Sequence, residues 1–153
     1  MKLKHTPSEI VAQLLIDLDL SSDPEETGTG TVSDFPIFIA FFPDTPNNSL
    51  CISDTDGVLL SRDMVEGETV DRYGLQIRSR VKTTEYTSGY NKLAEMRQVF
   101  SEDVLDNQVE IESTQYIIHN LRVTGTILVS GKESPQSKRN LFSLNLLATI
   151  HQL

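Results

Sequence analysis

The sequence predicts a single α+β domain over residues 1–153, in which a mixed, mainly antiparallel β-sheet carries an N-terminal helix and a central helix packed on one face. Three observations support this fold class. The chain has the length of one ordinary domain, and no linker separates two cores. Two segments have helical periodicity. Strand-like segments follow one another without intervening helices, which favours an antiparallel or mixed sheet over a doubly wound one.

The first predicted helix begins after Thr6. Thr6 suits the N-cap, Pro7 suits the first helical position, and Glu9 is placed to complete a capping box. One apolar stripe follows at helical spacing, formed by Ile10, Val11, Leu14, Leu15 and Leu18. Residues 21–34 are polar and rich in Gly, which ends the helix and predicts a flexible loop.

A strand covered on both faces is predicted next, because residues 35–42 form a continuous apolar run. Pro36 lies at its start, where a residue without a backbone N–H is tolerated. Beyond a predicted turn at 43–48, two short strands flank Asp56-Gly57, a dipeptide typical of hairpin turns. The following segment is polar, so we expect a flexible loop over about 54–71.

The segment 72–82 is the most informative part of the chain, because it predicts a strand with one apolar and one basic face. The apolar face comprises Tyr73, Leu75, Ile77 and Val81. The basic face comprises Arg72, Gln76, Arg78 and Arg80. Three arginines on one strand face of an otherwise acidic chain indicate a surface that contacts another protein. The alternative is an ordinary solvated face, whose ion pairs contribute about 0–1 kcal/mol each.

The central helix is predicted from about Thr84 to Val104, with a threonine as its N-cap. Its apolar stripe comprises Tyr86, Tyr90, Leu93, Met96 and Phe100. Gly89 costs this helix about 1 kcal/mol relative to Ala, and it would permit a close packing contact.

The carboxyl-terminal third predicts further strands. Residues 113–129 alternate loosely and predict one or two strands broken near Gly125. Residues 131–138 predict an exposed, flexible turn. The segment 142–151 alternates cleanly between apolar and polar residues and predicts the last strand.

Charge is unevenly distributed along this acidic chain, whose net charge is −9. Residues 1–76 hold 14 acids against 4 Lys or Arg, and residues 77–153 hold 8 against 9. This asymmetry favours head-to-tail association and argues against a nucleic-acid reader. The alternative is that the acidity serves only solubility.

No cofactor or metal site is expected. Gly28-Thr29-Gly30 lacks the lysine of a phosphate-binding loop, and Asp54-Thr55-Asp56-Gly57 lacks the glutamate of a calcium loop, since Val65 stands there. The histidines are not spaced as zinc ligands, and the single Cys51 is expected in the core of a protein made in a reducing compartment. No apolar run approaches the ~20 residues of a membrane span. The sequence therefore predicts no enzyme.

Several stretches, taken in order, carry a family resemblance. They are the N-terminal helix and the segments 35–44, 56–57, 62–68, 73–80, 86–93 and 138–145. Together these stretches resemble the tail terminator (minor capsid, head–tail joining) proteins of long-tailed bacteriophages. The loop 132–137 departs from the turn expected in that family.

The resemblance implies a structural virion protein. Such a protein forms a ring, expected to be hexameric, on the last ring of a finished tail tube, stops tube growth and offers a docking surface to the head connector. Its partners would be further copies of itself, the tail tube protein and the connector. DNA would only pass through the channel, and no membrane is involved. The location implied is the head-proximal end of the tail, after assembly in the host bacterial cytoplasm.

Interface residues follow as expectations. Arg78, Arg80, Arg122 and Arg139 are expected to make intersubunit or tube contacts. The loop 54–71 is expected to contact the tube protein or the connector, and its charged residues are Asp54, Asp56, Arg62, Asp63, Glu66 and Glu68. Charge reversal at Arg78 and Arg80 is expected to abolish the ring and leave the monomer folded. The alternatives are a head-completion or neck adaptor and a small cytoplasmic enzyme with an unrecognised site.

Overall fold

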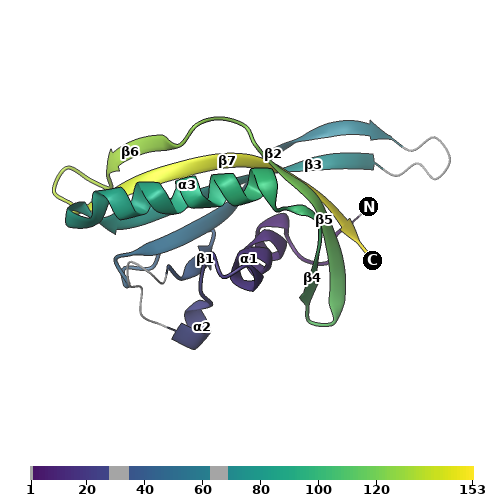
Figure 1. The fold of residues 1–153 in the computed structure, drawn as a ribbon, viewed down its shortest axis with the longest axis horizontal. Helices are drawn as coiled ribbons and strands as arrows, with labels where there is room; N and C mark the ends of the chain where they lie inside the picture. The colour runs from purple at the N-terminus through teal and green to yellow at the C-terminus, as the bar shows by residue number, and fades with distance from the viewer. Residues whose placement is uncertain (1, 28–34, 63–68) are drawn as a thin grey trace.

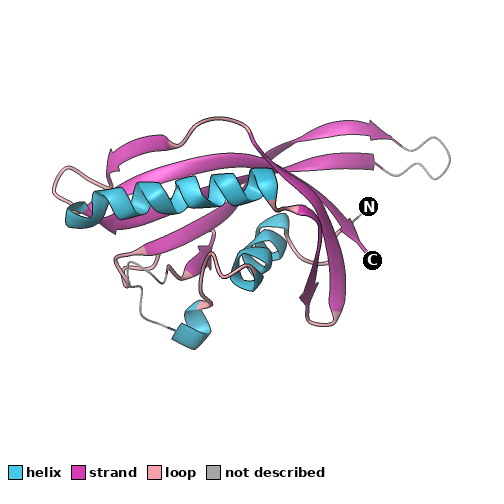
Figure 2. Cartoon of the chain, viewed as in Figure 1, coloured by secondary structure: helices cyan, strands magenta, loops and turns pink. Residues whose placement is uncertain are grey.

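A curled β-sheet forms the frame of the protein, and two helices pack against its inner face (Figures 1 and 2). The computed structural model describes residues 2–27, 35–62 and 69–153. In chain order the elements are α1 (Pro7–Asp17), α2 (Pro24–Thr27), β1 (Ile37–Ile39), β2 (Ser49–Arg62), β3 (Thr69–Lys82), the 3₁₀ helix η1 (Thr83–Glu85), α3 (Tyr86–Glu102), β4 (Leu105–Ile111), β5 (Thr114–Val123), β6 (Leu128–Lys132) and β7 (Arg139–Gln152).

Strand β7 lies at the centre of the sheet. The strand order is β1-β2-β3-β7-β5-β4, and β6 pairs with β7 beyond the end of β5. Among the described strands, only β1 and β2 run parallel to each other. The predicted α+β class with a mixed, mainly antiparallel sheet is therefore confirmed.

The core lies between the inner face of the sheet and the helices α1 and α3. On this face Leu75 pairs with Leu146, and Ile77 pairs with Leu144, and all four side chains are buried. Most residues of the predicted stripes point into the core, because Ile10, Val11, Leu14, Leu15, Leu93, Met96 and Phe100 are at most 2% exposed. Tyr86 and Tyr90, which were predicted in the stripe of α3, are instead 43% and 42% exposed and contact the edge of the Phe142 ring. The prediction that both helices cover one face is confirmed.

Local signals also fixed the start of α1. The backbone N–H of Glu9 donates to Thr6 Oγ1 at 3.3 Å, and the N–H of Thr6 donates to Glu9 Oε2 at 2.7 Å. This reciprocal pair is the predicted capping box. Because both partners lie within one helical turn, the sequence alone carries the whole signal.

Gly89 allows α3 to approach the sheet closely. A Cβ atom at this position would lie 2.7 Å from Val81 Cγ2 and 2.9 Å from Phe142 Cε2. The Ser79 hydroxyl donates to the Gly89 carbonyl oxygen at 3.1 Å across the same contact. The predicted close packing at Gly89 is confirmed.

The region 54–71 corrects a prediction. Residues up to 62 continue β2 and residues from 69 begin β3, so the two strands form a long arm that extends beyond the body of the protein (Figure 1). Asp56-Gly57 is an irregularity within this arm, where the register shifts between Thr55 and Val58, and it is not a hairpin turn. Residues 63–68 lie outside the described part.

A second glycine explains the difference. A Cβ on Gly57 would lie 2.2 Å from the Arg72 carbonyl oxygen, and a Cβ on Gly74 would lie 2.2 Å from the Asp56 carbonyl oxygen. Because neither glycine has a Cβ atom, the two backbones can approach each other closely here. The strands therefore continue to pair on both sides of a bulge. The dipeptide Asp-Gly occurs both in hairpin turns and in bulges, so the residues of the partner strand determine which of the two structures forms.

The other predicted loops contain some regular structure. Helix α2 and a bridge between Ser22 and Pro36 lie at the borders of 21–34, whose residues 28–34 are outside the described part. Strand β6 extends to Lys132, into the predicted turn at 131–138. Strand β4 was not predicted, because its sequence is polar and its turn to β5 uses Glu112 and Ser113, at φ 46° and 65°, in place of Asn-Gly.

Candidate assembly interface

The outer face of the sheet, opposite the helices, carries a ladder of polar side chains. Arg78 on β3 pairs with Cys51 on β2 and Ser143 on β7. One step along, Gln76 pairs with Asn145, and its Nε2 atom donates to Asn145 Oδ1 at 3.2 Å. The predicted alternation of β3 between an apolar and a polar face is therefore confirmed, but the segment 40–48 covers part of the polar face.

Arg80 holds this covering segment in place. Its side chain is only 1% exposed and donates to the carbonyl oxygens of Pro43, Pro46 (2.9 Å) and Asn47 (3.3 Å). Its Cζ atom lies 4.8 Å from the centroid of the Phe42 ring. The alternative of an ordinary solvated face does not apply to Arg80, because the chain's own segment 42–47 covers it. Its expected contact with another subunit or the tube stays a prediction.

Two acidic groups complete this cluster, which we call the arginine clamp (Phe42, Asp44, Arg80, Glu133 and Arg139). Glu133 lies 3.6 Å from Arg80 and 2.7 Å from Arg139. Arg139 donates to the Asp44 carbonyl oxygen at 2.9 Å and lies 3.6 Å from its carboxylate. Like Arg80, Arg139 therefore binds partners within its own chain.

Burial lowers the pKa of the Arg80 guanidinium, and the charge of Arg139 lowers it further, whereas Glu133 and Asp44 raise it. An arginine still keeps its charge at any ordinary pH. Three carbonyl oxygens and one carboxylate offset the desolvation of this buried charge. Reversing it would leave those acceptors unpaired and add a buried repulsion, so we now expect charge reversal at Arg80 to destabilise the monomer.

Arg78 has fewer partners than Arg80. Its Nη2 atom lies 3.4 Å from Cys51 Sγ, a weak acceptor, and its Cζ atom lies 5.2 Å from the centroid of the Phe42 ring. The Nε atom is buried without an acceptor, and no carboxylate of the described part lies within ion-pair distance. Arg78 therefore keeps unused hydrogen-bonding capacity on the outer face, next to the clamp.

The acidic residues predicted in 54–71 separate into different roles. Asp54 accepts hydrogen bonds from the Ser8 backbone N–H at 3.0 Å and the Ser8 hydroxyl at 2.7 Å. It thus fastens the base of the arm to the N-terminus of α1, where a negative charge is favourable. Asp56 is exposed at the bulge.

The remaining predicted residues of the arm have no described side chains. Arg62 pairs through its backbone with Thr69, and its side chain lies outside the described part. Asp63, Glu66 and Glu68 also lie outside the described residues.

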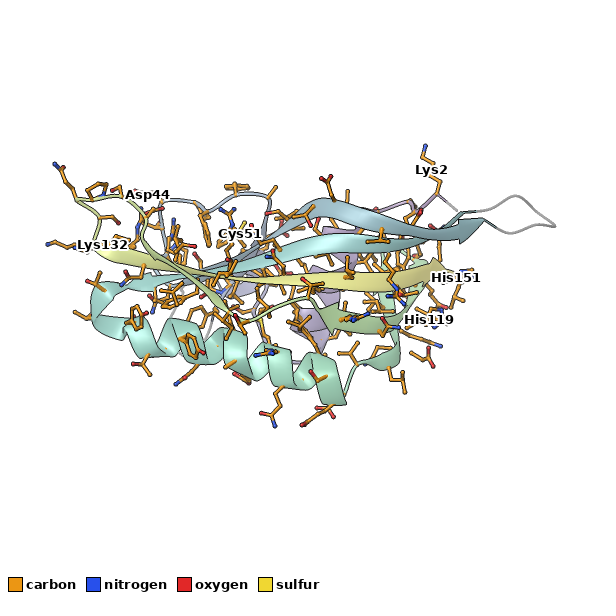
Figure 3. The ribbon with its side chains drawn as sticks, turned by 90° about the horizontal axis from the view of Figure 1, so that it is seen from above. Lys2, Asp44, Cys51, His119, Lys132 and His151 are labelled. Carbon is orange, nitrogen blue, oxygen red and sulfur yellow. The ribbon has the colours of Figure 1, made fainter. Side chains whose placement is uncertain are left out.

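Arg122 lies far along the sheet from the clamp. It pairs with Leu147 on β7, eight residues along that strand from Arg139 of the clamp. Figure 3 shows Asp44 of the clamp near one end of the molecule. Arg122 lines a cleft of about 520 Å³ together with Arg72 and Arg97. Sequence reasoning placed Arg72 on the basic strand but missed Arg97, because a lone charge on the exposed face of a helix carries no signal.

Few side chains of the described residues are placed to act together in catalysis or metal binding. Two histidines of the described part have close polar partners. His5 Nδ1 lies 2.6 Å from the Tyr116 hydroxyl, and its Nε2 atom lies 3.6 Å from Glu112 Oε2. His119 Nδ1 lies 2.6 Å from Asp106 Oδ1, and its ring centroid lies 6.5 Å from that of His151 (Figure 3). His119 is thus hydrogen-bonded. Across the described ranges, no group of three His, Cys, Asp or Glu residues could hold a metal ion, and no helix could span a membrane. Cys51 is buried, as predicted.

A polar, arginine-bearing sheet face with an extended arm is typical of a protein that works through contacts with other proteins. The chain belongs to the family of bacteriophage tail terminator proteins, whose family description matches residues 14–147. This is a family of structural phage proteins and not of enzymes, and it makes the chain a tail-assembly component of a virion. The resemblance noted in the sequence is thereby confirmed.

Other comparisons bear on the fold alone. A search of curated proteins found no match. Among solved structures, one chain with 13% sequence identity superposes with a TM-score of 0.51, covering 94% of this chain and 92% of its own length. At this identity the likeness supports the architecture and carries no further argument.

Proposed function

We propose that this protein caps the completed tail tube as a closed, hexameric ring, ends tube polymerisation and offers the surface to which the head connector docks. The observation that carries this proposal is the family match over residues 14–147. It covers the end of α1, all of α3 and the strands from β1 to most of β7, so it applies to most of the fold and not to one motif.

The shape of the subunit is compatible with ring formation. Both helices occupy the inner face of the sheet, which leaves the outer face available apart from the segment 40–48. The β2–β3 arm extends away from the body and gives each subunit a means to reach a neighbour (Figure 1). A heterologous contact repeated around an axis closes a ring.

Different arginines have different parts in this proposal. Arg78 and Arg122 contact other subunits or the tube directly, because neither has a carboxylate partner in the described part of its own chain. Arg80 and Arg139 act indirectly, by holding the segment 42–47 in the shape that a partner meets. In the arm, Asp54 anchors the base.

The remaining charged residues of the arm, including Asp56, contact the tube protein or the connector. The ring lies at the head-proximal end of the tail, is assembled in the host cytoplasm and lets DNA pass without sequence-specific binding. The net charge of −9 supports this last point, since specific DNA binding requires a basic face.

Electron microscopy of particles from a phage in which this gene is stopped early tests the proposal. Overlong tubes without heads are expected, because length control and joining then fail together. Free tails of normal length would instead assign the protein to the neck or the head side. Intact virions would refute an assembly role altogether.

A further inference from the structure

Three arginines converge on one cleft. The cleft of about 520 Å³ lies where the C-terminal end of α3 meets β5, and Arg97 and Arg122 line it from these two elements. Arg72, from the base of the arm, completes the lining. Three of the seven arginines of an acidic chain thus share one site, which we call the arginine groove.

These three guanidinium groups have no partner among the described residues. Within the part of the chain that the structure describes, none of them forms an ion pair or a side-chain hydrogen bond, in contrast to Arg80 and Arg139. The Nε atom of Arg72 is buried without an acceptor. Glu102 is the one carboxylate among the lining residues, and its Oε2 atom lies 3.5 Å from Gln98 Nε2. Because grouped like charges repel each other, the groove is stabilised when an anion enters.

The N-terminal part of the same chain is strongly acidic. Residues 5–61 contain ten carboxylates and not one Lys or Arg. Asp17 lies in the last turn of α1, at the negative end of the helix dipole, and that turn holds no basic residue. Asp19 follows at once, and both residues are exposed. The helix dipole disfavours the carboxylates at this end of α1, unlike the one at the base of the arm. Within the described residues neither Asp17 nor Asp19 has an ion pair, and Asp17 Oδ1 accepts a hydrogen bond from Gln13 Nε2 at 2.9 Å.

We infer that the arginine groove of one copy binds the Asp17–Asp19 end of α1 of a second copy. Guanidinium groups suit carboxylates because they can donate two parallel hydrogen bonds. The contact joins two different surfaces, so each copy can bind one neighbour with its groove and another with α1, as a ring requires. The inference rests on the proposed ring and specifies which surfaces meet in it.

Charge-swap complementation tests the inference. Plasmids would supply wild-type chain or variants to the phage whose own gene is stopped, and plaque titre would be measured. R97E/R122E and D17K/D19K should each lower the titre at least about 100-fold, and the quadruple variant that combines them should recover most of it, because attraction is restored. K82E/K132E is the matched control: it changes the net charge equally at exposed lysines outside the groove and should retain full titre.

Each remaining outcome overturns the inference. Full titre for R97E/R122E would show that the groove is not used. Loss of titre in both R97E/R122E and the quadruple variant would indicate another anion in the groove, such as DNA phosphate or another tail protein. Thermal unfolding of the purified variants should match that of the wild type, so that loss of fold is recognised. Failure of the proposed function itself would appear separately, as tails of normal length in the stopped phage without any plasmid.

Discussion

The guanidinium of Arg80 lies over the ring of Phe42, with 4.8 Å between the Cζ atom and the ring centroid. Such a stacked pair contributes about 2 kcal/mol or more when it is desolvated. The same side chain hydrogen-bonds to the backbone that follows Phe42, so one arginine fixes both the ring and its chain. The polar sheet face that a partner would meet therefore depends on a residue that the partner does not touch.

Replacing Arg80 with Ala should lower the free energy of unfolding by about 3–5 kcal/mol, because it leaves buried carbonyl oxygens and Glu133 without their partner. Urea denaturation measures this effect. Arg78→Ala, on the same face of the same strand but without an ion pair, is the control and should cost no more than about 1 kcal/mol. Equal losses in the two variants would contradict the clamp.

Gly89→Ala should destabilise the protein by about 1–3 kcal/mol, although alanine favours a helix by about 1 kcal/mol over glycine. The new methyl group would lie 2.7 Å from Val81 Cγ2, closer than packing allows. Gly125→Ala is the control, because a Cβ at Gly125 would have nothing within 4 Å. Thermal unfolding of both variants measures the difference, and a stabilised Gly89→Ala would show that α3 does not pack this closely.

Gly74→Ala should separate the strands of the arm near the bulge, because the new Cβ atom would lie 2.2 Å from the Asp56 carbonyl oxygen. A side chain could relieve such a clash by changing its rotamer, but a backbone atom cannot. We expect amide hydrogens near Thr55 and Asp56 to exchange faster, while those of α3 keep their protection. Hydrogen exchange read by NMR measures both regions. Unchanged exchange around Thr55 would contradict the close approach.

Stability should fall at alkaline pH through Tyr73. Burial raises the pKa of Tyr73 above its ordinary value of 10.0, and Asp71 raises it further. The unfolded chain therefore releases the phenolic proton first, and stability present below pH 10.0 is lost as the pH rises through the folded pKa. Tyr73→Phe should lose less stability than the wild type above about pH 10.

Denaturation curves at several alkaline pH values measure this slope. Leu128→Ala is the control, because Leu128 is 50% exposed and carries no titratable group, so the slope should stay that of the wild type. The same slope in Tyr73→Phe and the wild type would contradict a role for Tyr73.

Most of the confirmed predictions had a local cause, although the predicted threonine N-cap of α3 is wrong, since its N-cap is Glu85 without a side-chain hydrogen bond. The capping box at Thr6 and Glu9 and the apolar stripes of α1 and α3 depend on neighbours within one or two turns. The burial of Arg80 was not predicted, because its hydrogen-bond acceptors lie 33 to 37 residues earlier in the chain. No local sequence pattern shows that this earlier segment covers the outer face of the sheet.

For the candidate site too, local patterns were predicted from the sequence and contacts between distant segments were not. Alternation along β3 correctly placed Arg78 on a polar face, whereas the arginine groove joins residues from β3, α3 and β5 and is visible only once these meet. Asp54 was predicted to contact the tube protein or the connector. In the structure its carboxylate accepts a hydrogen bond from the hydroxyl of Ser8, which lies 46 residues earlier in the sequence. The order of family-like segments identified the family without any of these contacts.

The most direct test of the capping role is the growth of tail tubes in vitro with and without this protein. Tube protein would be polymerised, the purified chain added during elongation, and tube lengths measured by electron microscopy at successive times. The proposed function predicts that lengths stop increasing after the addition and that a ring of extra density appears at one end. Tubes that continue to elongate at the unchanged rate would contradict it.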